Sequence, residues 1–331
     1  MTKNSIQTHF PGIALSLVIA SAAYFLGRLE PVVGGAVFSI ALGILIASIW
    51  KRPAAFDAGV RFTSKYILQL AVILLGFEMS ISSVLTVGKQ SLWVIVTTLS
   101  TAFITVFIVG RLLKIDRTLR VLIGVGTAIC GGSAIAAASS AIHADDQDVS
   151  YSISTIFLFN VVAVFLFPAV GHLIGLSDTG FGMWAGTAIN DTSSVVAASY
   201  SFSDAAGNFA TIVKLTRSLM IVPITLALAI AYARINKGEN FFSLAKVFPW
   251  FVLGFVAAAV IRSLGLIPTE ISASLAWSGK FLIMAAMAAI GLNTDLKKFI
   301  TAGPRALALG GITWLAVMLS SLGIQMLGNL W

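Results

Sequence analysis

Two related octets place glycines and hydrogen-bonding side chains inside long apolar stretches of the chain. The first is GTAICGGS at residues 126–133, and the second is GTAINDTS at residues 186–193. A membrane helix that breaks at such an octet leaves free N–H groups and a positive dipole end at the start of the next half-helix. These are the features of an anion site. We therefore expect both octets to interrupt membrane helices and to line a polar site.

The candidate anion-binding residues follow from this chemistry. Glycines without a Cβ allow close approach to the backbone N–H groups, and hydroxyl groups can cap a helix or donate to an oxyanion. We assign anion binding to Gly131, Gly132, Ser133, Thr192, Ser193, Ser194, Lys214 and Arg217. The alternative for the small residues is that they only let membrane helices pack closely.

The second octet also contains a carboxylate. On insertion scales, a charged residue in the middle of a membrane helix costs about 2.5–3.5 kcal/mol, and such residues usually have a function. We expect Asp191, together with Asn190, to bind the coupling ion, which is H⁺ or Na⁺. Asn293, beside a glycine-marked helix end, is assigned to the same ion.

Two cations lie three residues apart in the apolar run 209–233, on one face of a helix. Facing inward, Lys214 and Arg217 would either neutralise Asp191 or attract a dianion. The alternative is that their side chains extend to the membrane interface. Pro223, further along the same run, is expected to kink the helix.

Composition determines which elements must position these residues. The chain has 331 residues, of which 58% are hydrophobic and 10% are charged. A soluble domain has roughly a quarter charged residues, so the composition indicates an integral membrane protein in a lipid bilayer. The net charge of +8 lies in short clusters between apolar runs, which argues against nucleic-acid binding. The single cysteine, Cys130, excludes an internal disulfide framework.

A helix needs about 20 mostly apolar residues to cross a bilayer. Eleven runs meet this criterion: 12–28, 32–50, 62–80, 91–111, 120–141, 151–174, 181–201, 209–233, 247–265, 271–291 and 306–329. We interpret the first run as a transmembrane helix and not as a cleaved signal peptide. No connection is long enough for a soluble domain, so the sequence predicts one membrane domain over residues 1–331.

The distribution of Lys and Arg orients these runs. With alternating sides, fifteen of the 21 Lys and Arg residues lie on the side of the N-terminus and three on the other. Because cytoplasmic loops are rich in Lys and Arg, the N-terminus is expected in the cytoplasm and the C-terminus outside.

A second similarity within the chain suggests an inverted repeat. The segments at 76–92 and 291–307 share Gly76/Gly291, Thr86/Thr301, Gly88/Gly303 and Leu92/Leu307, and they follow helices of opposite direction. The two octets, in contrast, lie within helices of the same direction, so the two offsets do not fit one repeat scheme. The predicted fold class is an all-α polytopic membrane protein with about eleven transmembrane helices, inverted repeats and two discontinuous helices.

Four segments together resemble a known family. They are GVGTAICGGSAIAA, GTAINDTSSVVAA, VKLTRSLMIVP and AAIGLNTDL, beginning at residues 124, 186, 213 and 288. They look like the YeiH-type family of bacterial inner-membrane proteins, which are described as sulfate exporters. The CGGSA segment is also similar to the helix crossing of bile-acid and sodium-symporter-like transporters, whose fold contains inverted repeats and two discontinuous helices. The resemblance implies sulfate export across the inner membrane.

These observations predict a secondary transporter of a small oxyanion, such as sulfate, sulfite or a sulfonate, coupled to H⁺ or Na⁺. The alternative is a cation/proton antiporter that uses Asp191 as the exchange site. We expect no enzymatic activity, because HExxH, GxSxG and paired carboxylates in one helix are absent, and GxxxxGK[ST] is absent as well. No cofactor or metal is expected, and the sequence is compatible with a homodimer.

Overall fold

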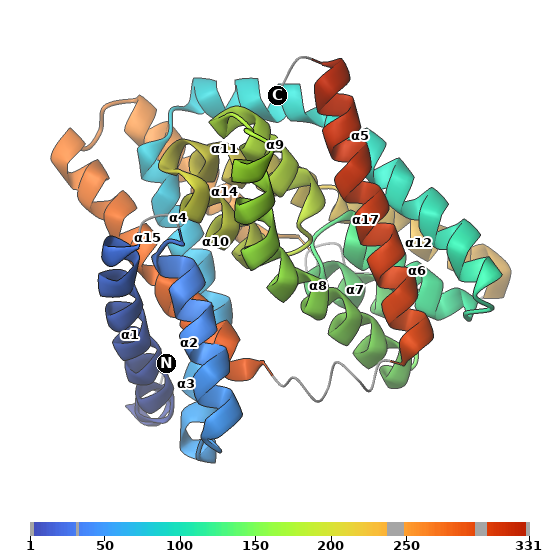
Figure 1. Ribbon diagram of the computed structural model, residues 1–331, viewed down its shortest axis with the longest axis horizontal. Helices are drawn as coiled ribbons and strands as arrows, with labels where there is room; N and C mark the ends of the chain where they lie inside the picture. The colour runs from blue at the N-terminus through green and yellow to red at the C-terminus, as the bar shows by residue number, and fades with distance from the viewer. Residues whose placement is uncertain (1–2, 31–32, 237–247, 295–302, 329–331) are drawn as a thin grey trace.

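The structure is a computed structural model that describes residues 3–30, 33–236, 248–294 and 303–328 (Figure 1). All regular structure in these residues is helical, which confirms the predicted all-α class. The α-helices are α1 (Lys3–Leu29), α2 (Gly35–Ile49), α3 (Asp57–Phe62), α4 (Leu68–Leu75), α5 (Ile81–Leu112), α6 (Arg117–Ala128), α7 (Gly132–Ile142), α8 (Asp146–Leu173), α9 (Asp178–Ala188), α10 (Thr192–Phe202), α11 (Asp204–Ser218), α12 (Ile221–Asn236), α14 (Trp250–Ser263), α15 (Thr269–Asn293) and α17 (Pro304–Leu327). Short helical segments, η1 (Ala54–Phe56), η2 (Thr63–Ile67) and η3 (Gly76–Glu78), extend and join α3 and α4.

Seven helical stretches in the described residues are long and apolar enough to cross a membrane. They are Thr8–Leu29, Ala54–Glu78, Ile81–Leu112, Asp146–Leu173, Asp204–Tyr232, Thr269–Asn293 and Pro304–Leu327. Three further apolar helices, α2, α7 and α14, have 15, 11 and 14 residues. The count of eleven crossings stays a prediction, because several expected runs consist of two shorter helices.

Helix α5 begins ten residues before the apolar run predicted for it at 91–111. The side chain of Ser80 accepts a hydrogen bond from the backbone N–H of Ser83 at 3.1 Å, and this cap starts the helix. The connection that the predicted runs leave at residues 81–90 is therefore helical, because capping extends the helix into a polar segment that an apolar-run criterion leaves out.

The apolar run 209–233 is also divided. Helix α11 ends at Ser218, α12 begins at Ile221, and Leu219 and Met220 form a turn between them. Pro223 is the third residue of α12, where its missing N–H costs little because the first N–H groups of a helix have no intrahelical acceptor. The structure thus places the irregularity before Pro223.

The helices gather into two groups, which Figure 1 shows beside each other. Each group has its own main cluster of buried apolar side chains. One core is built from α5 to α11 and α17, and the other mainly from α2, α4, α14 and α15. Helix α10 belongs to both, because Val195 and Ala198 pack in the first core while Val196 and Ala197 pack in the second. Helices α8 and α11 also contribute to both cores, through Val164, Ile212 and Leu215 in the second. The second octet therefore leads into one of the helices that join the two groups.

The helices that flank the proposed inverted repeat pack in pairs. Helix α4 contacts α15, and α5 contacts α17. Gly110 near the end of α5 approaches Leu309 near the start of α17, so this pair is antiparallel; a Cβ on Gly110 would lie 3.3 Å from Leu309 Cδ2. The repeat itself stays a prediction, and its matched position Thr301 lies outside the described residues.

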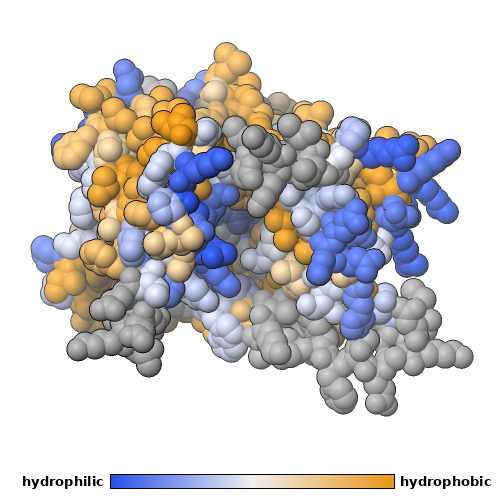
Figure 2. Space-filling view, turned by 90° about the horizontal axis from the view of Figure 1, so that it is seen from below, coloured by the Kyte–Doolittle hydropathy of each residue, from blue (hydrophilic) through white to orange (hydrophobic). Residues whose placement is uncertain are grey.

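The surface is rich in apolar side chains. Figure 2 shows broad hydrophobic areas, with hydrophilic residues gathered into a few groups. Trp93, Leu112 and Leu173 are 70%, 76% and 84% exposed. Large side chains of this kind would be unfavourable on so much of a water-facing surface, whereas lipid accommodates them.

Close contact between α2 and α15 depends on Gly43 and Gly291. A Cβ on Gly43 would lie 2.5 Å from Ala288 O, and one on Gly291 would lie 2.4 Å from Ile40 O. We expect Gly43→Val to lower the unfolding temperature in detergent, because overpacking costs about 1–3 kcal/mol. Gly323→Val is the matched control, since no heavy atom lies within 4 Å of a Cβ built there. Equal unfolding temperatures for the two variants would contradict this packing.

Candidate functional site

The first octet contains the end of α6 and the start of α7. The chain leaves α6 after Ala128 and re-enters a helix at Gly132. Gly131 has φ of 69°, a left-handed conformation that favours glycine, and its N–H donates to Gly126 O at 2.9 Å. No side chain caps α7. Space beside its first residue is open, because a Cβ on Gly132 would meet no heavy atom within 4 Å.

The second octet contains the end of α9 and the start of α10. Ile189 is extended, and α10 begins at Thr192. Asp191 is the N-cap: its carboxylate accepts hydrogen bonds from the backbone N–H of Ser193, at 2.9 Å, and from the Ser193 hydroxyl. The two half-helix starts therefore differ, since α10 has a carboxylate at its positive end and α7 has none.

Asn160 of α8 lies against both interruptions. Its Oδ1 accepts a hydrogen bond from the Asp191 backbone N–H at 3.2 Å. A Cβ on Gly131 would lie 3.6 Å from Asn160 Nδ2 and 3.8 Å from Asp191 Cβ. The starts of α7 and α10 thus lie side by side, in what we call the crossing: residues 127–133 and 187–194. Our sequence analysis missed Asn160, although a lone Asn within the apolar run FLFNVVAVFLF is a visible signal.

Lys214 of α11 binds the carbonyl ends of α6 and α9. Its Nζ donates to Ile129 O at 2.8 Å, to Ile189 O at 3.1 Å and to Asn190 O. The side chain is fully buried. An ammonium has three donors, so these bonds use all of them. A cation is favourable here because the C-terminal end of a helix carries a partial negative charge.

Arg217, one turn further along α11, completes the same arrangement. Its guanidinium donates to Thr127 O at 2.5 Å, Ala128 O at 2.7 Å and Ile189 O at 3.0 Å. It is also fully buried. Trp314 of α17 donates to Ala188 O at 3.2 Å. Together these side chains satisfy the carbonyl groups that a helix end leaves without intrahelical donors.

The remaining predicted residues divide between the crossing and other places. Thr192, Ser193 and Ser194 are buried in the first turn of α10, whereas Ser133 in α7 is exposed. Asn293 lies elsewhere: its Oδ1 accepts a hydrogen bond from Arg52 at 3.2 Å. Within the described residues, no hydrogen bond joins Asn293 to the crossing. The geometry does not support its assignment to the coupling ion, because Asn293 lies at the end of α15 and not at the crossing.

Asn190 and Asp191 have contrasting environments. Asn190 is fully buried, and neither its Oδ1 nor its Nδ2 has a hydrogen-bond partner in the described part of the chain. Asp191 is partly buried and forms no ion pair with a described residue; its carboxylate interacts with Ser193. Buried amide groups are normally hydrogen-bonded, so Asn190 is a strong candidate for contact with a bound ligand or ion.

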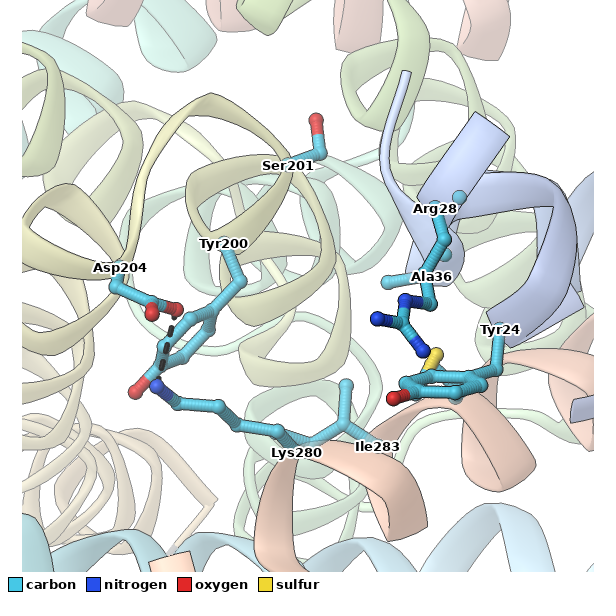
Figure 3. A pocket seen from close by; sticks show the side chains of 11 residues that line it. Tyr24, Arg28, Ala36, Tyr200, Ser201, Asp204, Lys280 and Ile283 are labelled. Atoms are coloured by element: carbon cyan, nitrogen blue, oxygen red, sulfur yellow. Dashed lines mark ion pairs between the residues drawn. The ribbon is translucent and has the colours of Figure 1, made fainter. Parts of the chain in front are cut away.

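A second polar site lies at the far end of α10. A cavity of about 210 Å³ is lined by residues of α1, α2, α10, α11 and α15. Figure 3 shows Lys280 and Tyr200 on one side and Arg28 and Tyr24 on the other. Lys280 pairs with Glu78 at 3.2 Å and with Asp204 at 3.0 Å. Tyr200 is nine residues beyond Asp191, which corresponds to about 14 Å along a helix.

Comparison with known proteins agrees with a membrane-embedded architecture. A family model described as "Conserved hypothetical protein 698" matches residues 11–310. A UPF0324 membrane protein of Streptococcus pyogenes serotype M6 is 46% identical, over 98% of this chain and 100% of its own length. The chain belongs to the UPF0324 family of membrane proteins. No solved structure matches it.

Other UPF0324 relatives match this chain over a similar length. The Fusobacterium nucleatum protein is 44% identical over 95% of this chain and 96% of its own length, and the Streptococcus mutans protein is 46% identical over 97% of both. All are named membrane proteins, which confirms the multi-pass membrane assignment made from composition. Their names give no substrate, so the likeness to sulfate exporters and to bile-acid transporters stays a prediction.

Proposed function

We propose that this UPF0324 protein is a secondary transporter of a small oxyanion of the sulfate, sulfite or sulfonate type, coupled to H⁺ or Na⁺. The observation that supports this most directly is the difference between the two half-helix starts. The start of α10 already has the Asp191 carboxylate, whereas the start of α7 has no side-chain cap and faces open space at Gly132. An oxyanion at α7 would accept hydrogen bonds from its first N–H groups.

Asp191 supplies the coupling in this proposal. Its Cβ lies 3.8 Å from where a Cβ on Gly131 would be, so an anion at the start of α7 would be close to the carboxylate. Two negative charges at short range repel each other, and protonation of Asp191 removes this repulsion. Anion binding and proton binding therefore favour each other, and this coupling is reciprocal. One proton would be carried in the same direction as the anion.

The roles of the two cations change from the initial prediction. Lys214 has no N–H donor left for a substrate, because three carbonyl oxygens accept from it. Lys214 and Arg217 instead hold the ends of α6 and α9 and add positive charge behind the anion site. Direct anion contacts fall to the N–H groups at the start of α7 and to Ser133.

The test is transport by purified protein in lipid vesicles. Labelled sulfate uptake should exceed that of protein-free vesicles when the lumen is alkaline, and a protonophore should remove the excess. Sulfite and a small alkyl sulfonate should compete. Uptake that neither a pH gradient nor a Na⁺ gradient drives, or no uptake of any of these three anions, would overturn the proposal. The expected membrane is the bacterial inner membrane, with the N-terminus in the cytoplasm.

A cation/proton antiporter is the second candidate. It is favoured by Asn190, whose unpartnered amide precedes the Asp191 carboxylate and offers an oxygen ligand to a cation. In that case, added Na⁺ should change the luminal signal of a pH-sensitive dye in vesicles that contain no sulfate. The oxyanion transporter predicts no such response without an anion.

Gly132→Val separates anion binding from folding. The new side chain would extend into the open space at the start of α7 and obstruct its N–H groups, and its Cβ would meet no neighbouring heavy atom within 4 Å. We expect the unfolding temperature without anion to stay close to that of the unmodified protein, and the stabilisation by sulfate to be lost. Gly323→Val, which also extends into open space but lies on α17, should retain the sulfate effect. Equal sulfate stabilisation of both variants would place the anion elsewhere.

A further inference from the structure

The surroundings of the Lys214 ammonium are those of a bound monovalent cation. Three backbone carbonyl oxygens, from Ile129, Ile189 and Asn190, face its Nζ. They come from two separate half-helix ends, and the group is fully buried. Within the described residues, no carboxylate forms an ion pair with Lys214. Its three hydrogen bonds are therefore all to backbone carbonyl dipoles.

The same kinds of ligand hold inorganic cations in other membrane proteins. In transporters with broken helices, unwound backbone carbonyls and the C-terminal ends of half-helices coordinate Na⁺. Both kinds are present here, because Ile129 and Ile189 are the first residues after α6 and α9, and Asn190 lies in the unwound segment. We propose that the Lys214 ammonium is a tethered cation that occupies a Na⁺-type site between the two half-helix ends.

This inference identifies the coupling ion. With the carbonyl site filled by a covalently attached charge, no inorganic cation is needed to hold the ends of α6 and α9 together. The ion that moves is then the proton on Asp191, which lies at the start of α10 and not at the carbonyl ends of α6 and α9. This last step rests on the proposed function, whereas the cation site itself does not, because Lys214 binds backbone carbonyls whether or not an anion is transported.

The carbonyls next to the Lys214 site have other donors, namely Arg217 and Trp314. They satisfy the neighbouring carbonyls of Thr127, Ala128 and Ala188, and Arg217 shares Ile189 O with Lys214. Removal of the Lys214 side chain alone would leave Ile129 O and Asn190 O without the ammonium donor that they have now. The resulting space would be lined by carbonyl oxygens and large enough for a small cation.

The test is Lys214→Ala in detergent without sulfate. Its unfolding temperature is measured in choline, sodium, potassium and methylammonium chloride at equal ionic strength. In choline we expect the unfolding temperature of Lys214→Ala to be several degrees below that of the unmodified protein. In sodium, potassium or methylammonium chloride it should rise again in part, and the rise should increase with the concentration of the cation. Lys214→Met should be insensitive to the cation, because its side chain fills the space. Lys89→Ala, which removes an exposed lysine, should also be insensitive.

Two outcomes would overturn the proposal. One is an unfolding temperature of Lys214→Ala that is the same in all four salts. The other, which needs no variant, is saturable stabilisation of the unmodified protein by Na⁺ relative to choline. If Lys214→Ala does not fold in choline, its recovery during purification in methylammonium chloride supports the tethered cation, and no recovery in any of the salts overturns it. Cation rescue without any sulfate transport would leave this inference intact while the proposed function fails.

Discussion

Asp191→Asn is expected to abolish the effect of a pH gradient on anion uptake while the protein stays folded. The reason is that Asn caps a helix about as well as Asp does, so the start of α10 keeps its hydrogen-bond acceptor. The variant lacks only the titratable charge. Because coupling free energies of 1–3 kcal/mol correspond to about 5–150-fold changes in affinity, we expect gradient-driven uptake to fall by about tenfold or more.

The measurement compares initial uptake of labelled sulfate at equal and at unequal luminal pH. Asp178→Asn is the matched control, because Asp178 is also in the first turn of a half-helix but is exposed and accepts from Ser203 at 2.6 Å. It should retain the full gradient effect. If the pH gradient changed sulfate uptake equally in the two variants, Asp191 would be excluded as the coupling group. A much lower unfolding temperature of Asp191→Asn would instead show that the Asp191 charge stabilises the fold.

The two octets show what local sequence can predict. Gly131 and Asp191 have the residue types that a helix break requires: a glycine for a left-handed φ and a carboxylate for an N-cap. Both helices end and restart within the predicted octets. The spacing of Lys214 and Arg217 also placed them on one helix face, and both point inward. These features depend on neighbours in the chain, which a sequence displays directly.

What the sequence could not display is which helix ends meet. A break creates a positive end and a negative end a few ångströms apart, and a cation on another helix can approach either region. Tertiary packing places Lys214 and Arg217 at the carbonyl ends of α6 and α9, so the expected direct contact with an anion was replaced by contact with the backbone. Asn160 was missed for a related reason, because its partner Asp191 is 31 positions away. The turn at Leu219 and Met220 contains no glycine, and the sequence signal for it is Pro223, which lies three residues beyond.

Arg217→Ala is expected to be the most destabilising single change at the crossing. It would remove hydrogen bonds to Thr127 O, Ala128 O and Ile189 O, and Lys214 would still bind only the last of these. A hydrogen bond to a charged group contributes about 1.5–3 kcal/mol, and a buried acceptor left unpaired costs about 1–3 kcal/mol. The combined loss is comparable with the total stability of a domain, about 5–15 kcal/mol.

We therefore expect Arg217→Ala to aggregate on size-exclusion chromatography in detergent or to unfold far below the unmodified protein. Arg111→Ala is the matched control, since Arg111 is exposed in the last turn of α5. Arg217→Lys should be intermediate, because an ammonium lacks the planar fork that reaches several carbonyls at once. An Arg217→Ala protein as stable as Arg111→Ala would mean that the carbonyl ends of α6 and α9 find other donors. The crossing would then not need its buried guanidinium, and the division of roles between α11 and the two half-helices would have to be abandoned.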